Sequence, residues 1–224
     1  MKKIAILIFF TILITGCKDS CERIKEPADR DDCFFNKAIN SGVMDYCDRI
    51  SSNLTRNSCY SEIAISDRDI DLCMSIRGKA KENCVAKIAL SMNDLELCST
   101  LNTTYWSDVC FGGIAELRGN FTICLRVNNT YDRDRCYRNI AIKTNESAPC
   151  FYISNSTTRD LCVFRIAVNT LNETLCDKTK SVLIGDLCFK RIAELEKNIS
   201  ICIGASYPRI QDSCKKKVRE LLGE

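Results

Sequence analysis

The chain has 224 residues, 17 cysteines, no histidine and a formal net charge of +3. So small a charge excludes the strongly basic surface that nucleic acids or acidic polymers would require. The absence of histidine excludes Ser–His and Cys–His catalytic pairs, and the chain contains no Gly-rich loop of the phosphate-binding type.

The N-terminus has the order of an export signal. Lys2 and Lys3 precede an apolar run over residues 4–14, and small residues follow it. This run is shorter than the roughly 20 apolar residues that cross a bilayer. We therefore expect export from the cytoplasm, and loss of the two lysines with the signal would lower the net charge to about +1.

The end of this signal suggests a lipid anchor. The segment Ile14-Thr15-Gly16-Cys17 resembles the lipobox of prokaryotic lipoproteins, whose cysteine is acylated and becomes the mature N-terminus. The resemblance implies a cleaved signal peptide over 1–16, a lipidated N-terminus over 17–20 and membrane attachment through Cys17. The alternative is an ordinary signal peptide that is cut nearby.

The remaining cysteines form a repeat. Their intervals alternate between 12 and 14 residues, with one interval of 11, so residues 21–224 divide into eight units of about 26 residues without a Gly/Pro-rich linker. A fixed period of this length is typical of a solenoid. The cysteines are Cys21, Cys33, Cys47, Cys59, Cys73, Cys84, Cys98, Cys110, Cys124, Cys136, Cys150, Cys162, Cys176, Cys188, Cys202 and Cys214.

Each unit predicts two antiparallel helices. Apolar residues at the second cysteine and one, four and five positions after it, as in Cys136, Tyr137, Ile140 and Ala141, share one helical face. A shorter helix is expected around the first cysteine. Its N-cap candidates stand four residues earlier, at Asp69, Asp94, Asn120, Asn172 and Asn198. The prediction is an all-α solenoid of about eight short helical hairpins, stapled by disulfides.

The two end units are more polar than the others. Lys215, Lys216 and Lys217 replace much of the apolar stripe in the last unit, and Lys37 stands where the other units have isoleucine or valine. Terminal repeats of a solenoid require a polar outer face. These lysines therefore predict the two ends of the array.

The sixteen repeat cysteines predict eight disulfides, because they are even in number and the chain is expected outside the cytoplasm. Pairing across the 12-residue interval uses every cysteine, whereas pairing across 14 leaves Cys21 and Cys214 alone. Antiparallel helices also favour the shorter interval, although sequence does not prove connectivity. Metal or redox chemistry is the alternative, but the chain lacks the CxxC spacing common to such sites, so no metal and no cofactor is expected.

A carboxylate or amide recurs two residues before each second cysteine. We interpret it as a signal for the start of the long helix, with a calcium-binding ladder of carboxylates as the alternative. Arg30, Arg56, Arg133 and Arg159 adjoin these positions and are expected to pair with the acids or to face solvent. The recurring residues are Asp31, Asn57, Glu82, Asp108, Asp134, Asp160, Asp186 and Asp212.

Eight Asn-x-Ser/Thr acceptors predict N-glycosylation. The favoured sites lie in the turn between the two helices of a unit, at Asn53, Asn102, Asn128 and Asn155. The other four stand just before the short helix, where capping also explains an asparagine: Asn120, Asn145, Asn172 and Asn198.

The unit, with Asp-x-Cys-aromatic-x-x-Ile-Ala followed by an N-cap, Leu and Cys, resembles the cysteine-rich helical repeats of predicted archaeal exported proteins. It is loosely similar to secreted cysteine-rich relatives of tetratricopeptide repeats. The resemblance implies an architecture but no activity. A solenoid held by lipid outside the cell is expected to meet protein, peptide or glycan partners. We therefore expect a membrane-anchored interaction or structural protein and not an enzyme. The alternatives are a metal-handling thiol protein and a surface hydrolase.

Overall fold

The structure, a computed structural model, describes residues 20–224. This part of the chain is helical and contains no strand. Each unit contains a short helix followed by a long one, which confirms the predicted stapled solenoid. The long helices are α1 (Pro27–Ser41), α3 (Asn53–Asp67), α5 (Lys79–Met92), α7 (Thr104–Arg118), α8 (Thr130–Thr144), α9 (Ser156–Thr170), α10 (Val182–Glu196) and α11 (Pro208–Leu222).

The short helices contain four to six residues each. Most are 3₁₀ helices, a form common in such short pieces. They are η1 (Ser20–Arg23), α2 (Asp45–Asp48), α4 (Ile70–Ser75), α6 (Leu95–Ser99), η2 (Phe121–Arg126), η3 (Ala148–Tyr152), η4 (Glu173–Lys178) and η5 (Ile199–Gly204).

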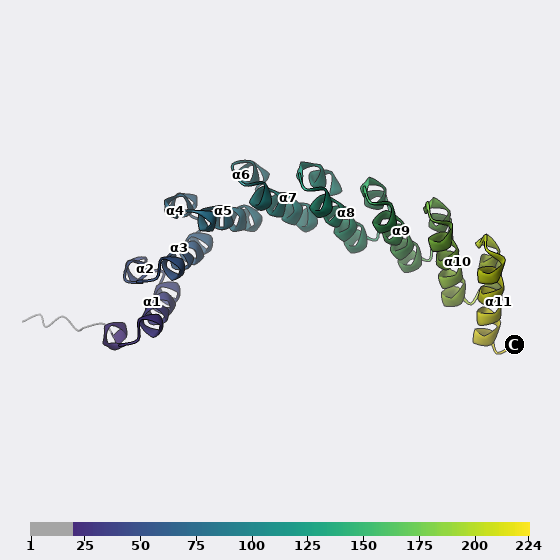
Figure 1. The fold of residues 1–224 in the computed structure, drawn as a ribbon, viewed down its shortest axis with the longest axis horizontal. Helices are drawn as coiled ribbons and strands as arrows, with labels where there is room; N and C mark the ends of the chain where they lie inside the picture. The colour runs from purple at the N-terminus through teal and green to yellow at the C-terminus, as the bar shows by residue number, and fades with distance from the viewer. Residues whose placement is uncertain (1–19) are drawn as a thin grey trace, which may run out of the picture.

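The units follow one another along a curved array. Figure 1 shows an arch in which the short helices lie along the outer edge and the long helices along the inner edge. Each long helix contacts the long helix of the next unit as well as the short helices beside it. Neighbouring units therefore bury one another's apolar faces, as a solenoid requires.

The core has the predicted apolar stripe. In α7, Cys110, Phe111, Ile114 and Ala115 are all buried, and the equivalent positions are buried in the other central units. The alanine five residues after the second cysteine is fully buried in each of the seven units that have it. A larger side chain there would overpack the contact between helices.

The two kinds of helix differ in how well the sequence predicts their N-termini. All five predicted N-caps of the short helices are confirmed, because each side chain accepts a backbone N–H hydrogen bond from the first turn. The start of the long helices is a correction: they begin about six residues before the second cysteine, as α3 does at Asn53. Their side-chain N-caps include Ser52, Asn129, Asn155 and Ser181. The recurring acids thus lie inside the helices.

The long helices end on residues in the left-handed conformation. These residues have φ between 51° and 81°, and they include glycines such as Gly119 but also Leu171. Glycine adopts this conformation without steric cost, whereas it destabilises the folded chain by about 1 kcal/mol or more at other residues. The array therefore contains helix ends that are sterically strained.

Leu171→Gly is expected to raise the free energy of unfolding by about 1 kcal/mol, because the leucine has φ of 52° and a half-exposed side chain. Urea denaturation followed by circular dichroism measures the change. Gly119→Leu is the reciprocal variant and should lower stability by a similar amount. Equal stability of Leu171→Gly and the parent chain would contradict the strain.

Both ends of the array have the predicted polar character. In the last unit Cys214 and Val218 are buried, while Lys216 and Lys217 are exposed. In the first unit the Lys37 ammonium lies 5.7 Å from the centre of the Tyr46 ring, so its charge faces an aromatic surface.

Candidate functional site

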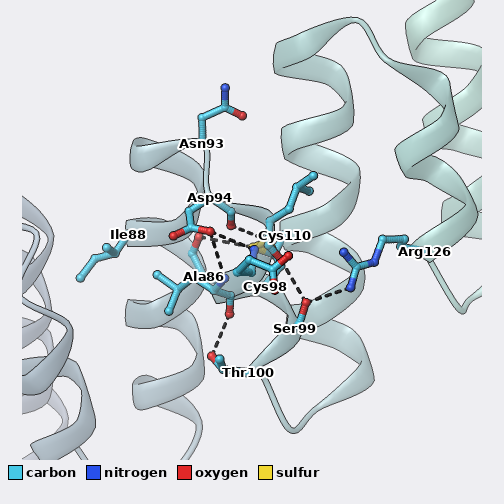
Figure 2. Close-up of a disulfide and its surroundings, with 12 residues drawn as sticks. Ala86, Ile88, Asn93, Asp94, Cys98, Ser99, Thr100, Cys110 and Arg126 are labelled. Carbon is cyan, nitrogen blue, oxygen red and sulfur yellow. Dashed lines mark hydrogen bonds between the residues drawn. A yellow bond between two sulfur atoms is a disulfide. The ribbon is translucent and has the colours of Figure 1, made fainter.

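Eight disulfides join each short helix to the long helix of the same unit. Seven span 12 residues, the Cys73–Cys84 bond spans 11, and all have Cα–Cα distances of 5.5–5.9 Å. Figure 2 shows the Cys98–Cys110 bond between α6 and α7, with Arg126 of the next unit donating to the Ser99 hydroxyl at 2.8 Å. This bridge thus lies where consecutive units also contact one another.

These bonds use every cysteine in residues 20–224. So many disulfides indicate an oxidising, extracytoplasmic environment. Within the same residues, no group of three or more Cys, Asp or Glu side chains is placed to hold a metal ion. The calcium ladder considered from the sequence is therefore not assembled in the described part of the chain.

The recurring acids link consecutive units instead. Asp134 of α8 accepts hydrogen bonds from the backbone N–H groups of Ser154 and Asn155, at 2.9 and 3.0 Å. Asn155 is the N-cap of α9, so the carboxylate lies beside the N-terminus of the next long helix, where its charge is favourable. We call this arrangement a carboxylate clamp, and the interface between two consecutive units a seam.

Six of the seven seams contain this clamp, with N···O distances of 2.6–3.5 Å. The six acids are largely buried, which makes the hydrogen bonds obligatory for them. They are Asp31, Glu82, Asp108, Asp134, Asp160 and Asp186.

In two of the clamps the hydrogen bonds lower the pKa of the carboxyl group. Burial alone would raise the pKa of Asp160, but hydrogen bonds from the backbone of Lys180 and Ser181 and from Arg159 hold that pKa below its usual value of 3.8. The pKa of Asp31 is likewise lowered, since hydrogen bonds from Ser51 and Ser52 outweigh the effect of burial. A general acid needs a raised pKa, so these two carboxyls are shifted in the opposite direction.

The arginines next to the recurring residues have two roles. Arg159 pairs with Asp160 at 3.3 Å, as expected. Arg56 and Arg133 instead donate to carbonyl oxygens of the turn before their own helix, those of Ile50 and Val127, at 2.9 and 3.3 Å. These two arginines therefore hold the turn before their own helix, which corrects the expectation that they pair with acids or face solvent.

Asn57 and Asp212 are the two recurring residues that form no clamp. Asp212 belongs to the last unit of the described residues, where no following unit lies against it, and it is exposed. Asn57 is uncharged, and its seam contains the unit with the 11-residue disulfide interval. The clamp and its exception are the features that sequence reasoning missed.

The eight asparagines of the glycosylation sequences are all exposed. Of the favoured four, Asn102 and Asn128 lie in turns, Asn53 is the first residue of α3, and Asn155 is the N-cap of α9. In the second group, Asn120, Asn172 and Asn198 cap short helices as described above. Glycosylation remains a prediction for all eight.

The long helices leave one side uncovered by short helices. In each long helix, the residues one and five positions before the second cysteine share a helical face. We call these residues of α7, α8, α9 and α10 the open face. Large exposed apolar side chains recur on it, including Tyr105 (65 % exposed) and Tyr131 (75 % exposed). The open face consists of Tyr105, Val109, Tyr131, Arg135, Thr157, Leu161, Leu183 and Leu187.

Two shallow hollows adjoin the open face. One, of about 270 Å³, lies between α7 and α8 and is lined by Tyr105, Gly112 and Arg135 among others. The second, of about 480 Å³, lies between α8 and α9 and is lined by Leu161 and Arg165 among others. Only residues of long helices line these two hollows, so a ligand would reach them without displacing a short helix.

The predicted lipidation site Cys17 lies outside the described residues, as does the predicted signal peptide. In residues 20–224, no helix is both long and apolar enough to cross a membrane. Comparison with known proteins gives no match to this chain among protein-family models, curated proteins or solved structures.

Proposed function

We propose that this protein is an interaction or structural protein of the cell surface, attached to the membrane by lipid at Cys17. The observation that carries the proposal is the open face, a surface on which exposed apolar side chains recur from unit to unit, on a frame stapled by a disulfide in every unit. A rigid array loses little conformational entropy when such a surface binds a partner.

The sequence supports the anchor and the location. The N-terminal segment resembles a lipobox, and the sixteen paired cysteines suit an oxidising compartment. A single acyl chain binds membranes only marginally, so a diacyl anchor is required for stable attachment. An archaeal cell surface would accommodate both the lipid and N-glycans on Asn53, Asn102, Asn128 and Asn155.

Fractionation of cells that express the full chain tests the anchor. We expect the protein in the membrane fraction, resistant to carbonate and high salt and released by detergent. Cys17→Ala should abolish this attachment, while Lys18→Ala, the neighbouring change, should leave it intact. Carbonate-soluble wild-type protein, or a Cys17→Ala variant that stays in the membrane, would contradict the proposal.

A photo-crosslinking residue at Tyr131 tests the open face in the same cells. We expect defined cross-linked products that disappear in a Leu161→Glu, Leu183→Glu double variant, since added charge disrupts an apolar contact. The same cross-linker at Asn36, on the exposed surface of α1, is the control position. Identical products from both positions would exclude the open face as the binding surface.

A further inference from the structure

The seam between α3 and α5 differs from the other six. Asn57 replaces the clamp acid, and its side chain forms no hydrogen bond within residues 20–224. The turn that follows Ile76 corresponds to the clamped turn after Val127 in a regular unit and likewise has two residues before its long helix; the shorter interval arises in α5, which begins five residues before its cysteine where α8 begins six before. In the described chain, the backbone N–H groups of Arg77 and Gly78 therefore lack the carboxylate that their counterparts bind.

A hollow of about 640 Å³ occupies this seam. It is lined by Arg56, Asn57, Tyr60, Ser75 and Arg77 among others, and no acidic residue lines it. The other two hollows described above are smaller, at about 270 and 480 Å³. The equivalent place in the seam between α10 and α11 is a smaller hollow of about 140 Å³, which is lined by the clamp acid Asp186 among others.

The charges around the hollow favour an anion. Arg56 donates from Nε to the Ile50 carbonyl at 2.9 Å and from Nη2 to the Ser51 carbonyl at 3.3 Å, which holds its guanidinium in place. Arg77 is exposed and forms no ion pair or side-chain hydrogen bond in the described chain. A guanidinium with five N–H donors suits a carboxylate, which accepts two of them side by side.

One lining residue of the hollow, Tyr60, is bonded to an acid. The Tyr60 hydroxyl donates a short hydrogen bond to the Asp48 carboxylate. Burial and this bond raise the pKa of Tyr60 to about 12, so Tyr60 stays neutral at physiological pH. Asp48 does not line the hollow, so the negative charge of Asp48 lies outside the hollow.

We propose that this seam binds a carboxylate side chain of an acidic peptide segment, which takes the place of the clamp acid in the other six seams. Arg77 and the free N–H groups of the turn bind the carboxylate, and Arg56 supplies a second positive charge. The site adds a ligand chemistry to the interaction function proposed above. That this seam meets a biological partner depends on the interaction function proposed above. Binding of a carboxylate to the seam does not depend on the membrane anchor.

Titration of the purified mature chain, uniformly labelled with ¹⁵N, tests the site. The probes are the peptide acetyl-Gly-Glu-Gly-amide and its glutamine analogue, which differs only in charge and hydrogen-bonding ability. We expect saturable shifts of the Arg77 and Gly78 amide signals with the glutamate peptide and at least about tenfold weaker binding of the glutamine peptide. Equal binding of the two peptides, or shifts elsewhere only, would overturn the proposal.

Two variants locate the binding. Asn57→Asp supplies an internal carboxylate, so it should abolish the peptide-induced shifts and raise the melting temperature. Asn36→Asp adds the same charge on the exposed surface of α1 and should leave binding unchanged. Arg77→Gln should weaken binding about tenfold while the chain remains folded by circular dichroism. An Asn57→Asp variant that binds the glutamate peptide like the parent chain, or binding of inorganic phosphate without binding of the peptide, would refute the site.

Discussion

Replacement of Cys124 and Cys136 together by alanine should lower the free energy of unfolding by about 3 kcal/mol. Their disulfide closes a 12-residue span, and both side chains are buried at the centre of the array. The loss arises chiefly because the unfolded chain regains the conformational freedom that the bridge removes. Urea denaturation measures the change, and hydrogen exchange maps where protection is lost.

The position of the lost bridge determines the extent of unfolding. A central unit contacts neighbours on both sides, so we expect faster exchange in α7, α8 and α9. The matched control is the same double change at Cys202 and Cys214, in the last unit. There the loss of protection should stay within η5, α11 and the adjoining part of α10. Unchanged exchange around α8 after loss of the central bridge would contradict its structural role.

Asp160→Ala should lower stability by about 2 kcal/mol at neutral pH. The variant leaves the N–H groups of Lys180 and Ser181 without their buried acceptor, and it removes the partner of Arg159. Asp212→Ala is the matched control, because Asp212 occupies the same position in its unit but binds no following unit in residues 20–224. Its effect should remain within about 0.5 kcal/mol.

The stability difference between the parent chain and this variant is expected to depend on pH. The pKa of Asp160 is lower in the folded chain than its ordinary 3.8, so its contribution is complete above that value. As the pH falls below 3.8, the carboxylate becomes protonated in the folded chain as well and the contribution is lost. The stability difference between the parent chain and Asp160→Ala should therefore shrink progressively as the pH is lowered below about 4. A difference that stays constant over this range would show that the clamp is not ionic.

The period of the cysteines was sufficient to predict the solenoid, its eight units and its all-α class. Because the apolar stripe and the N-cap residues repeat with the same period, local signals and packing agree in nearly every unit. The length of the long helices was predicted less well. Their first turn contains few apolar residues, so periodicity alone did not reveal that α3 begins at Asn53, ahead of the stripe.

The sequence shows that the clamp acids recur with the period of the units, but it does not show the geometry of the clamp. An acid that recurs every 26 residues or so indicates a structural role, yet spacing within a unit does not tell which neighbour the side chain reaches. In the structure, Asp134 bonds to residues 20 and 21 positions later. The coincidence of Asn57 with the one shortened interval was also visible in the sequence, and only the fold joins the two in one seam.

Mapping of the disulfides in protein purified without reductant tests the central claim, an exported array stapled within every unit. Free thiols are alkylated first, and the protein is then digested with trypsin. Residues 88–118 contain no internal Lys or Arg and include both Cys98 and Cys110, so the pairing in the structure leaves this peptide unlinked and lacking the two thiol hydrogens of its reduced form. We predict this result and no alkylated cysteine among the sixteen. A peptide 88–118 joined to those containing Cys84 and Cys124, or alkylated free thiols in these units, would contradict the account.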